Sequence, residues 1–171
     1  SPHYHPMSQG IALEGMRLVK DYLPRAHADG ADIEARAQMM SAAAMGATAF
    51  QKGLGAIHAL SHPVGAWHHT HHGTTNAVFM PAVLQFNRAA IEQRFGLAAA
   101  YLGIEGGFDG FCSFVDDLNT RLGIPKTLTD LGVKDPDLDT LTHAALADPS
   151  VGGNPVGMDY DNTRALLESC L

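Results

Sequence analysis

Apolar residues recur at steps of three and four along most of the chain, and this spacing is typical of helices that bury one face. No segment alternates between apolar and polar residues over the length of a strand. The pattern therefore predicts an all-α fold of several helices. The expected helices cover residues 10–23, 33–50, 53–62, 76–87, 89–102, 111–122, 126–131, 136–147 and 160–171.

Prolines and polar residues set the expected helix ends. Pro24 is expected to end the first helix, because proline lacks a backbone N–H and clashes with the preceding turn. Pro63 is expected to perturb the third helix, and residues 68–75 have no helical period and are predicted to form a loop. Asp32 is expected to cap the second helix. Apolar residues recur along that helix at steps of three and four, namely Ile33, Ala37, Met40, Ala44, Ala47 and Phe50. Its many small residues suggest close packing against other helices, and these are Ala42, Ala43, Ala44, Gly46 and Ala47.

Composition and charge restrict the classes of protein that fit. With 171 residues, 46% of them apolar, the chain is long enough for one domain with a core, and we expect a single helical domain over residues 1–171. The formal charge is −7 without any run of Lys or Arg, which argues against a nucleic-acid partner or an anionic membrane surface. The longest apolar stretch, residues 77–84, is too short to span a bilayer. Only two cysteines, Cys112 and Cys170, favour a reducing, cytoplasmic setting.

Histidines supply the candidate chemistry. Six of the 10 histidines lie close together, namely His58, His62, His68, His69, His71 and His72. His58 and His62 are four residues apart, so on a helix both imidazoles project from one face. A loop that returns a third imidazole to this face would give three nitrogen donors, which Fe²⁺ and Zn²⁺ accept. The alternative is a surface loop rich in histidine, and no Asp or Glu lies between positions 58 and 84 to add a carboxylate ligand.

The sequence around these histidines resembles the signature of iron-containing (group III) alcohol dehydrogenases. The matching stretches are G-L-G-A-I-H-A-L-S-H-P-V-G-A at 53–66 and H-G-T-T-N-A-V-F-M-P at 72–81. The first residues, S-P-H-Y-H-P-M at 1–7, and the stretches at 124–128 and 147–155 also look like segments of that family. The resemblance therefore covers nearly the whole chain.

The resemblance implies that the chain is the C-terminal helical domain of such an enzyme, with a dehydroquinate synthase-like fold. It implies that His58 and His72 are metal ligands, with Fe²⁺ as the metal and Zn²⁺ also accommodated. It further implies that His62 is catalytic, and that this residue passes a proton or contacts the nicotinamide cofactor. The family's other ligands, an Asp and a His four residues later, precede the segment that matches Ser1. The chain is thus expected to be cut at its N-terminal edge, without the nucleotide-binding α/β domain that holds most of NAD or NADP.

The resemblance also implies a reaction and partners. In the full enzyme a metal acts as a Lewis acid on the oxygen of a small alcohol, and hydride leaves to NAD(P)⁺, which interconverts alcohols with aldehydes or ketones. The isolated domain is expected to be inactive, to need the N-terminal nucleotide-binding domain as its partner, and to associate as a homodimer through an exposed apolar face. The alternative is a non-catalytic, His-rich helical protein that binds Zn²⁺ or Ni²⁺ through residues 68–72.

Overall fold

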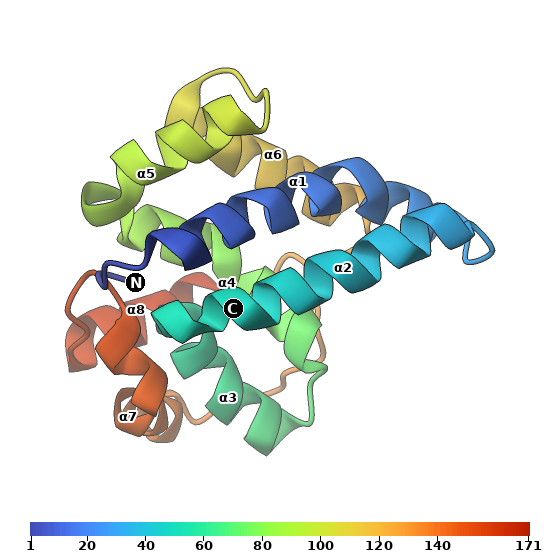
Figure 1. Cartoon of the computed structure of the whole chain (residues 1–171). Coiled ribbons are helices and arrows are strands. Elements are labelled where there is room, and N and C mark those ends of the chain that lie inside the picture. Colours follow the sequence, from blue (N-terminus) through green and yellow to red (C-terminus); the bar gives the residue numbers. More distant parts are fainter. The chain divides into compact units, whose positions relative to one another are not determined.

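The computed structural model describes residues 1–171 and contains helices but no β-strand (Figure 1). The all-α prediction is therefore confirmed. No helix is long and apolar enough to cross a membrane. The helices are α1 (Pro6–Ala28), α2 (Ile33–Ala49), α3 (Ala56–His68), α4 (His72–Phe86), α5 (Arg88–Tyr101), α6 (Gly107–Arg121), α7 (Leu138–Ala147) and α8 (Tyr160–Ser169), with short 3-10 helices η1 (Phe50–Lys52) and η2 (Pro149–Gly153).

The chain divides into two compact units. The first unit contains residues 1–2, 53–91 and 123–171, and the second contains residues 3–52 and 92–122. Helices α3, α4, α7 and α8 thus belong to the first unit, and α1, α2 and α6 belong to the second. All the candidate site residues named from the sequence lie in the first unit.

The first unit is built on a core of apolar side chains from its four helices. Leu60 of α3, Phe79 of α4 and Leu167 of α8 are fully buried in this core. Helix α3 contacts α4, α7 and η2, so it is surrounded by the other elements of the unit. Its position, and the direction of the side chains on its open face, are fixed by this packing.

In the second unit α1 and α2 lie side by side (Figure 1). Asp32 caps α2, as predicted, because its side chain accepts a hydrogen bond from the Ala35 N–H. The prediction that Pro24 ends the first helix is wrong, since α1 continues to Ala28. The last turn of α1 is held by Arg25, whose guanidinium lies 2.9 Å from Asp32 and 2.7 Å from Glu34. These ion pairs join the end of α1 to the start of α2.

Helix α2 is expected from the sequence to pack closely through small residues, and one of these, Ala42, is buried. Ile33 and Met40 are 74% and 76% exposed, whereas Ala35 and Ala42 are buried. Helix α1 approaches α2 closely at Gly15, where an added Cβ would lie 3.4 Å from the Met45 Cβ. Small residues therefore contribute to the contact, whereas Ile33 and Met40 are exposed.

Residues 126–131 form turns rather than the predicted short helix. Leu128 lies at the centre of this segment and is fully buried. Its N–H donates to the Cys170 carbonyl at 2.6 Å, and its carbonyl accepts from the Val133 N–H at 2.9 Å. The bond to Cys170 ties this segment to the C-terminal end of the chain, which a regular helix here would not do.

Candidate metal centre

Three imidazoles come together in the first unit. His58 and His62 project from α3, and His72 is the first residue of α4. The ring centroids of His58 and His62 are 5.6 Å apart, those of His58 and His72 are 5.3 Å apart, and those of His62 and His72 are 5.5 Å apart. The structure thus gathers, in a nearly equilateral triangle, the three residues that the sequence singled out.

A short connection brings His72 beside α3. Helix α3 continues through Pro63 to His68, so only residues 69–71 separate it from α4. The predicted loop over 68–75 is therefore too long. The cause is the fully buried hydroxyl of Thr75, which lies 2.7 Å from the Thr70 hydroxyl and 2.9 Å from the His71 carbonyl. These contacts begin α4 at His72.

The start of α3 is fixed by a buried pair of amides. The side chains of Asn87 and Asn154 exchange two hydrogen bonds of 2.9 Å, and the Asn154 Oδ1 also accepts from the Ala56 N–H at 3.1 Å. Gly55 is the N-cap residue, and a Cβ at this position would lie 3.0 Å from the Asn154 Oδ1. A glycine is needed here because the amide approaches the backbone so closely.

Asn76 connects His58 with His72. Its Nδ2 atom lies 3.1 Å from the His72 Nε2 and 3.4 Å from the His58 Nε2. The two Nε2 atoms therefore face a common point. The sequence analysis did not select Asn76 as a site residue, although its position one helical turn after His72 is a signal that could have identified it.

Asp148 supplies a carboxylate next to His62. Its Oδ2 atom lies 2.7 Å from the His62 Nδ1, and its Oδ1 accepts from the Ser150 N–H at 2.8 Å. Burial alone would raise the pKa of Asp148, but the hydrogen bonds from Ser150 and His62 outweigh burial and hold this pKa below its usual range. The ionised carboxylate accepts a hydrogen bond from the Nδ1–H of His62, so the proton of the neutral ring sits on Nδ1 and Nε2 carries the lone pair.

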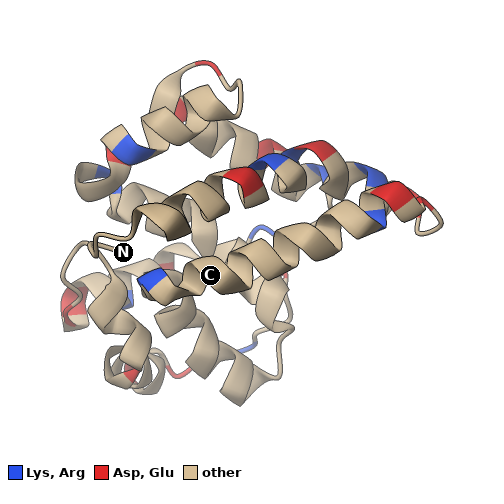
Figure 2. Ribbon diagram, viewed as in Figure 1, with Lys and Arg blue, Asp and Glu red and all other residues tan.

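The surroundings of His58 favour its neutral form. Burial lowers the pKa of His58 below its ordinary value, and the neighbouring His72 and His62 lower it further. Helices α3 and α4 contain no Lys, Arg, Asp or Glu (Figure 2). His58 is therefore neutral at physiological pH, which is the form in which imidazole binds a metal.

His58 and His72 fit a divalent transition metal as two of its ligands, because both Nε2 atoms face one point and imidazole suits iron and zinc. The chain does not complete such a site, since no group of three or more His, Cys, Asp or Glu side chains is arranged to hold a metal ion. The roles of His58, His62 and His72 stay predictions at this point.

The other clustered histidines lie at helix ends. His69 follows the last residue of α3 in a left-handed conformation with φ of 54°. The His71 side chain caps α4 by accepting from the Thr74 N–H at 3.4 Å. The ring contacts of the triangle involve only His58, His62 and His72.

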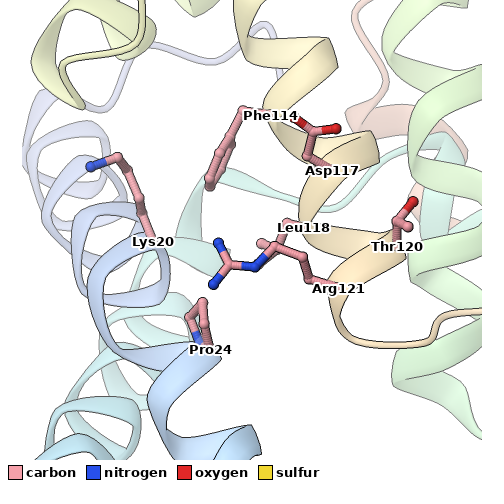
Figure 3. Close-up of a pocket in the computed structure, with 7 residues that line it drawn as sticks. All are labelled: Lys20, Pro24, Phe114, Asp117, Leu118, Thr120 and Arg121. Carbon is pink, nitrogen blue, oxygen red and sulfur yellow. The ribbon is translucent and has the colours of Figure 1, made fainter.

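The second unit contains a cavity of about 360 Å³ between α1 and α6 (Figure 3). Its lining includes two cations and one acid, together with apolar side chains, and none of its residues is a histidine or a cysteine. This cavity therefore offers no imidazole or thiolate to a metal ion. The lining residues are Lys20, Pro24, Phe114, Asp117, Leu118, Thr120 and Arg121.

The helical fold and the triangle of imidazoles define the chain as a helical domain with a histidine site suited to a divalent metal. Comparison with known families gives a narrower assignment. The family model described as "Fe-containing alcohol dehydrogenase family, C-terminal" matches residues 1–171. The chain therefore belongs to the Fe-containing alcohol dehydrogenase family and is its C-terminal domain.

Relatives match over the whole chain. It is 38% identical over 180 residues to a 4-hydroxybutyrate dehydrogenase from Cupriavidus necator, covering 100% of this chain and 47% of that protein. It is 36% identical to an NAD-dependent methanol dehydrogenase from Bacillus methanolicus, covering 97% of this chain and 46% of that protein. The crystal structure of a 1,3-propanediol oxidoreductase matches with a TM-score of 0.94 at 29% identity, covering 100% of this chain and 47% of that one. The chain spans about half the length of these relatives.

Proposed function

We propose that this chain is the metal-binding half of an iron-dependent alcohol dehydrogenase, which interconverts alcohols and aldehydes or ketones with NAD or NADP. The observation that carries the proposal is the arrangement of His58 and His72, whose Nε2 atoms face the Asn76 Nδ2 at 3.4 and 3.1 Å. Membership of the Fe-containing family supports this function. So do the names of the two relatives, both of which are dehydrogenases.

His58 and His72 would hold Fe²⁺, or Zn²⁺ in its place, through their Nε2 atoms. When bound, the metal supplies a Lewis acid that stabilises negative charge on the substrate oxygen. The chain's own contribution is to fix the direction of both imidazoles before binding. Asn154 anchors the start of α3, and Thr75 anchors the start of α4.

His62 is the catalytic residue in this proposal, and it also contacts the nicotinamide cofactor. Because Asp148 accepts a hydrogen bond from the Nδ1–H, the Nε2 atom of His62 is free to take up a proton when an alcohol is oxidised and to return it during reduction. The His62 side chain is 41% exposed. This exposure allows the proton to pass on to solvent.

The remaining functions belong to the upstream half of the enzyme. A nucleotide-binding α/β domain there would bind most of NAD or NADP and supply the missing ligands, so this chain alone would be inactive. The coverage of about 47% of each relative agrees with such a partner. We further propose a cytoplasmic location, in keeping with the presence of only two cysteines in the chain. A homodimer is also proposed, which would cover exposed apolar residues such as Met40.

An anaerobic titration of the chain with Fe²⁺, and separately with Zn²⁺, tests the ligand assignment. Binding is expected in the wild type and lost in the His58→Ala/His72→Ala variant. A second variant, His68→Ala/His69→Asn/His71→Ser, changes the rest of the cluster and keeps residues that suit the left-handed position and the helix cap. It is expected to bind metal normally. Binding that survives the first variant and disappears in the second would instead identify a non-catalytic His-rich metal-binding protein.

A further inference from the structure

Asn76 contacts the same atoms that the proposed metal would use. Its Nδ2 lies within hydrogen-bond distance of Nε2 in both His58 and His72. An amide nitrogen has two protons to donate and no lone pair to offer. One side chain therefore donates to two imidazoles at once.

Each of these imidazole nitrogens has a single lone pair. When Nε2 accepts a hydrogen bond from the Asn76 amide, the proton of that neutral ring is on Nδ1. A metal ion needs the same Nε2 lone pair. Asn76 and a metal therefore cannot share His58 or His72, and binding of one requires release of the other.

The carbonyl end of Asn76 gives an independent observation. Its Oδ1 atom is buried and has no hydrogen-bond partner. A buried polar atom without a partner is unfavourable and is rare in native proteins. While Nδ2 binds both imidazoles, the Oδ1 atom of Asn76 has no hydrogen-bond partner. Once Nδ2 is released, the side chain can adopt another rotamer in which Oδ1 is hydrogen-bonded.

We propose that Asn76 holds the metal-facing lone pairs of His58 and His72 when the site is free of metal, and that it must release both before a divalent cation binds. The inference rests on the proposed function, because it takes these two histidines as ligands. Asn76 is then a positioning residue that lowers the affinity for metal and stabilises the metal-free fold. A residue with a purely structural role would do otherwise, because its loss would weaken both the fold and metal binding.

Titration of Zn²⁺ into the 171-residue chain, with thermal unfolding of the metal-free protein, tests this inference. Asn76→Ala is expected to bind Zn²⁺ about 3- to 10-fold more tightly, because two modest hydrogen bonds no longer compete with the metal. The same variant is expected to unfold at a lower temperature without metal. Asn76→Leu, which keeps the side-chain volume, covers the case that the alanine variant fails to fold. Gln85→Ala, an exposed amide on the same helix, is the matched control and leaves both quantities unchanged.

NMR spectroscopy of the Asn76 side-chain amide provides a second test. In the wild type the Asn76 side-chain amide signals in a ¹⁵N–¹H spectrum are expected to move as Zn²⁺ is added, in step with occupancy. Weaker or unchanged Zn²⁺ binding in both Asn76 variants, or amide signals that do not move, would overturn the inference while leaving the ligand assignment intact. Zn²⁺ binding that persists in His58→Ala/His72→Ala would overturn the ligand assignment and the inference together.

Discussion

The Nδ1 atom of His62 lies 2.7 Å from the Oδ2 atom of Asp148, although 86 positions separate the two residues in the sequence. This hydrogen bond joins α3 to the end of α7, where Asp148 also caps η2. It gives the proposed proton-transfer residue one fixed tautomer and one fixed ring direction.

The first prediction concerns this carboxylate. In the full-length enzyme Asp148→Asn is expected to lower kcat on the order of 10-fold or more, because an amide NH₂ facing Nδ1 selects the opposite tautomer of His62. Metal content should stay the same, since the hydrogen bond of Asp148 goes to His62, which is not one of the two proposed ligands. Steady-state kinetics and metal analysis measure the two quantities. Asp135→Asn, at an exposed position with φ of 43° that asparagine tolerates, is the charge-matched control. An unchanged kcat in Asp148→Asn would remove the residue from the relay.

The second prediction concerns the hydrogen-bonded side-chain amides of Asn87 and Asn154, which fix the start of α3. Asn154→Ala leaves the Ala56 N–H and both polar ends of the Asn87 side chain without their partner. Buried polar groups left unpaired are destabilising, so the free energy of unfolding is expected to fall by about 2–4 kcal/mol. Urea denaturation measures this change. Gln85→Ala should change the same quantity by less than about 0.5 kcal/mol, and equal effects of the two substitutions would contradict the assignment.

The third prediction compares adjacent glycines of η2. A Cβ at Gly153 would collide with the carbonyl of Leu54, just before α3, whereas a Cβ at Gly152 would meet nothing within 4 Å. Gly153→Ala is therefore expected to destabilise the protein by about 1–3 kcal/mol, as overpacking does. Gly152→Ala should be neutral or slightly stabilising, because it restricts the unfolded chain. Thermal unfolding of both variants provides the comparison, and an equal Tm for the two would be inconsistent with the close contact.

The fourth prediction concerns the acid range. Hydrogen bonds from Arg17 and then Tyr101 lower the pKa of Glu14 from 4.5 to about 2. The folded-state pKa is thus below the unfolded value, so the contribution of Glu14 to stability is present above pH 4.5 and is lost as the pH falls toward 2. A ¹³C titration of the Glu14 carboxyl group is expected to show this low midpoint. Tyr101→Phe should raise the midpoint, and a midpoint at the ordinary value in the wild type would refute the contacts.

Much of the fold follows from local pattern, and the errors have local causes. The three- and four-residue spacing predicts α5 and α7 to within about two residues at each end. Helices α1, α3 and α4 continue through Pro24, Pro63 and Pro81. A proline removes one backbone hydrogen bond, and contacts elsewhere on the helix outweigh that loss. Such contacts are tertiary, so the spacing of residues does not reveal them.

The candidate site likewise contains residues that local sequence predicts and one residue that it does not. His58, His62 and His72 are close in sequence, and the structure brings their rings together. Asp148 was not predicted as a site residue, because an Asp before a Pro also has an ordinary role in capping a turn. Its contact with His62 depends on the packing of α7 against α3, which no local pattern encodes.

The short connection between α3 and α4 also bears on the order of folding. His58 and Asn76 are only 18 positions apart, so the hairpin that joins them closes with a small loss of chain entropy. His62 and Asp148 must close a separation of 86 positions, and α7 is the later helix to emerge from the ribosome. His58 and Asn76 are thus expected to come together in the nascent chain before Asp148, which orients the proposed proton-transfer residue His62, has been synthesised.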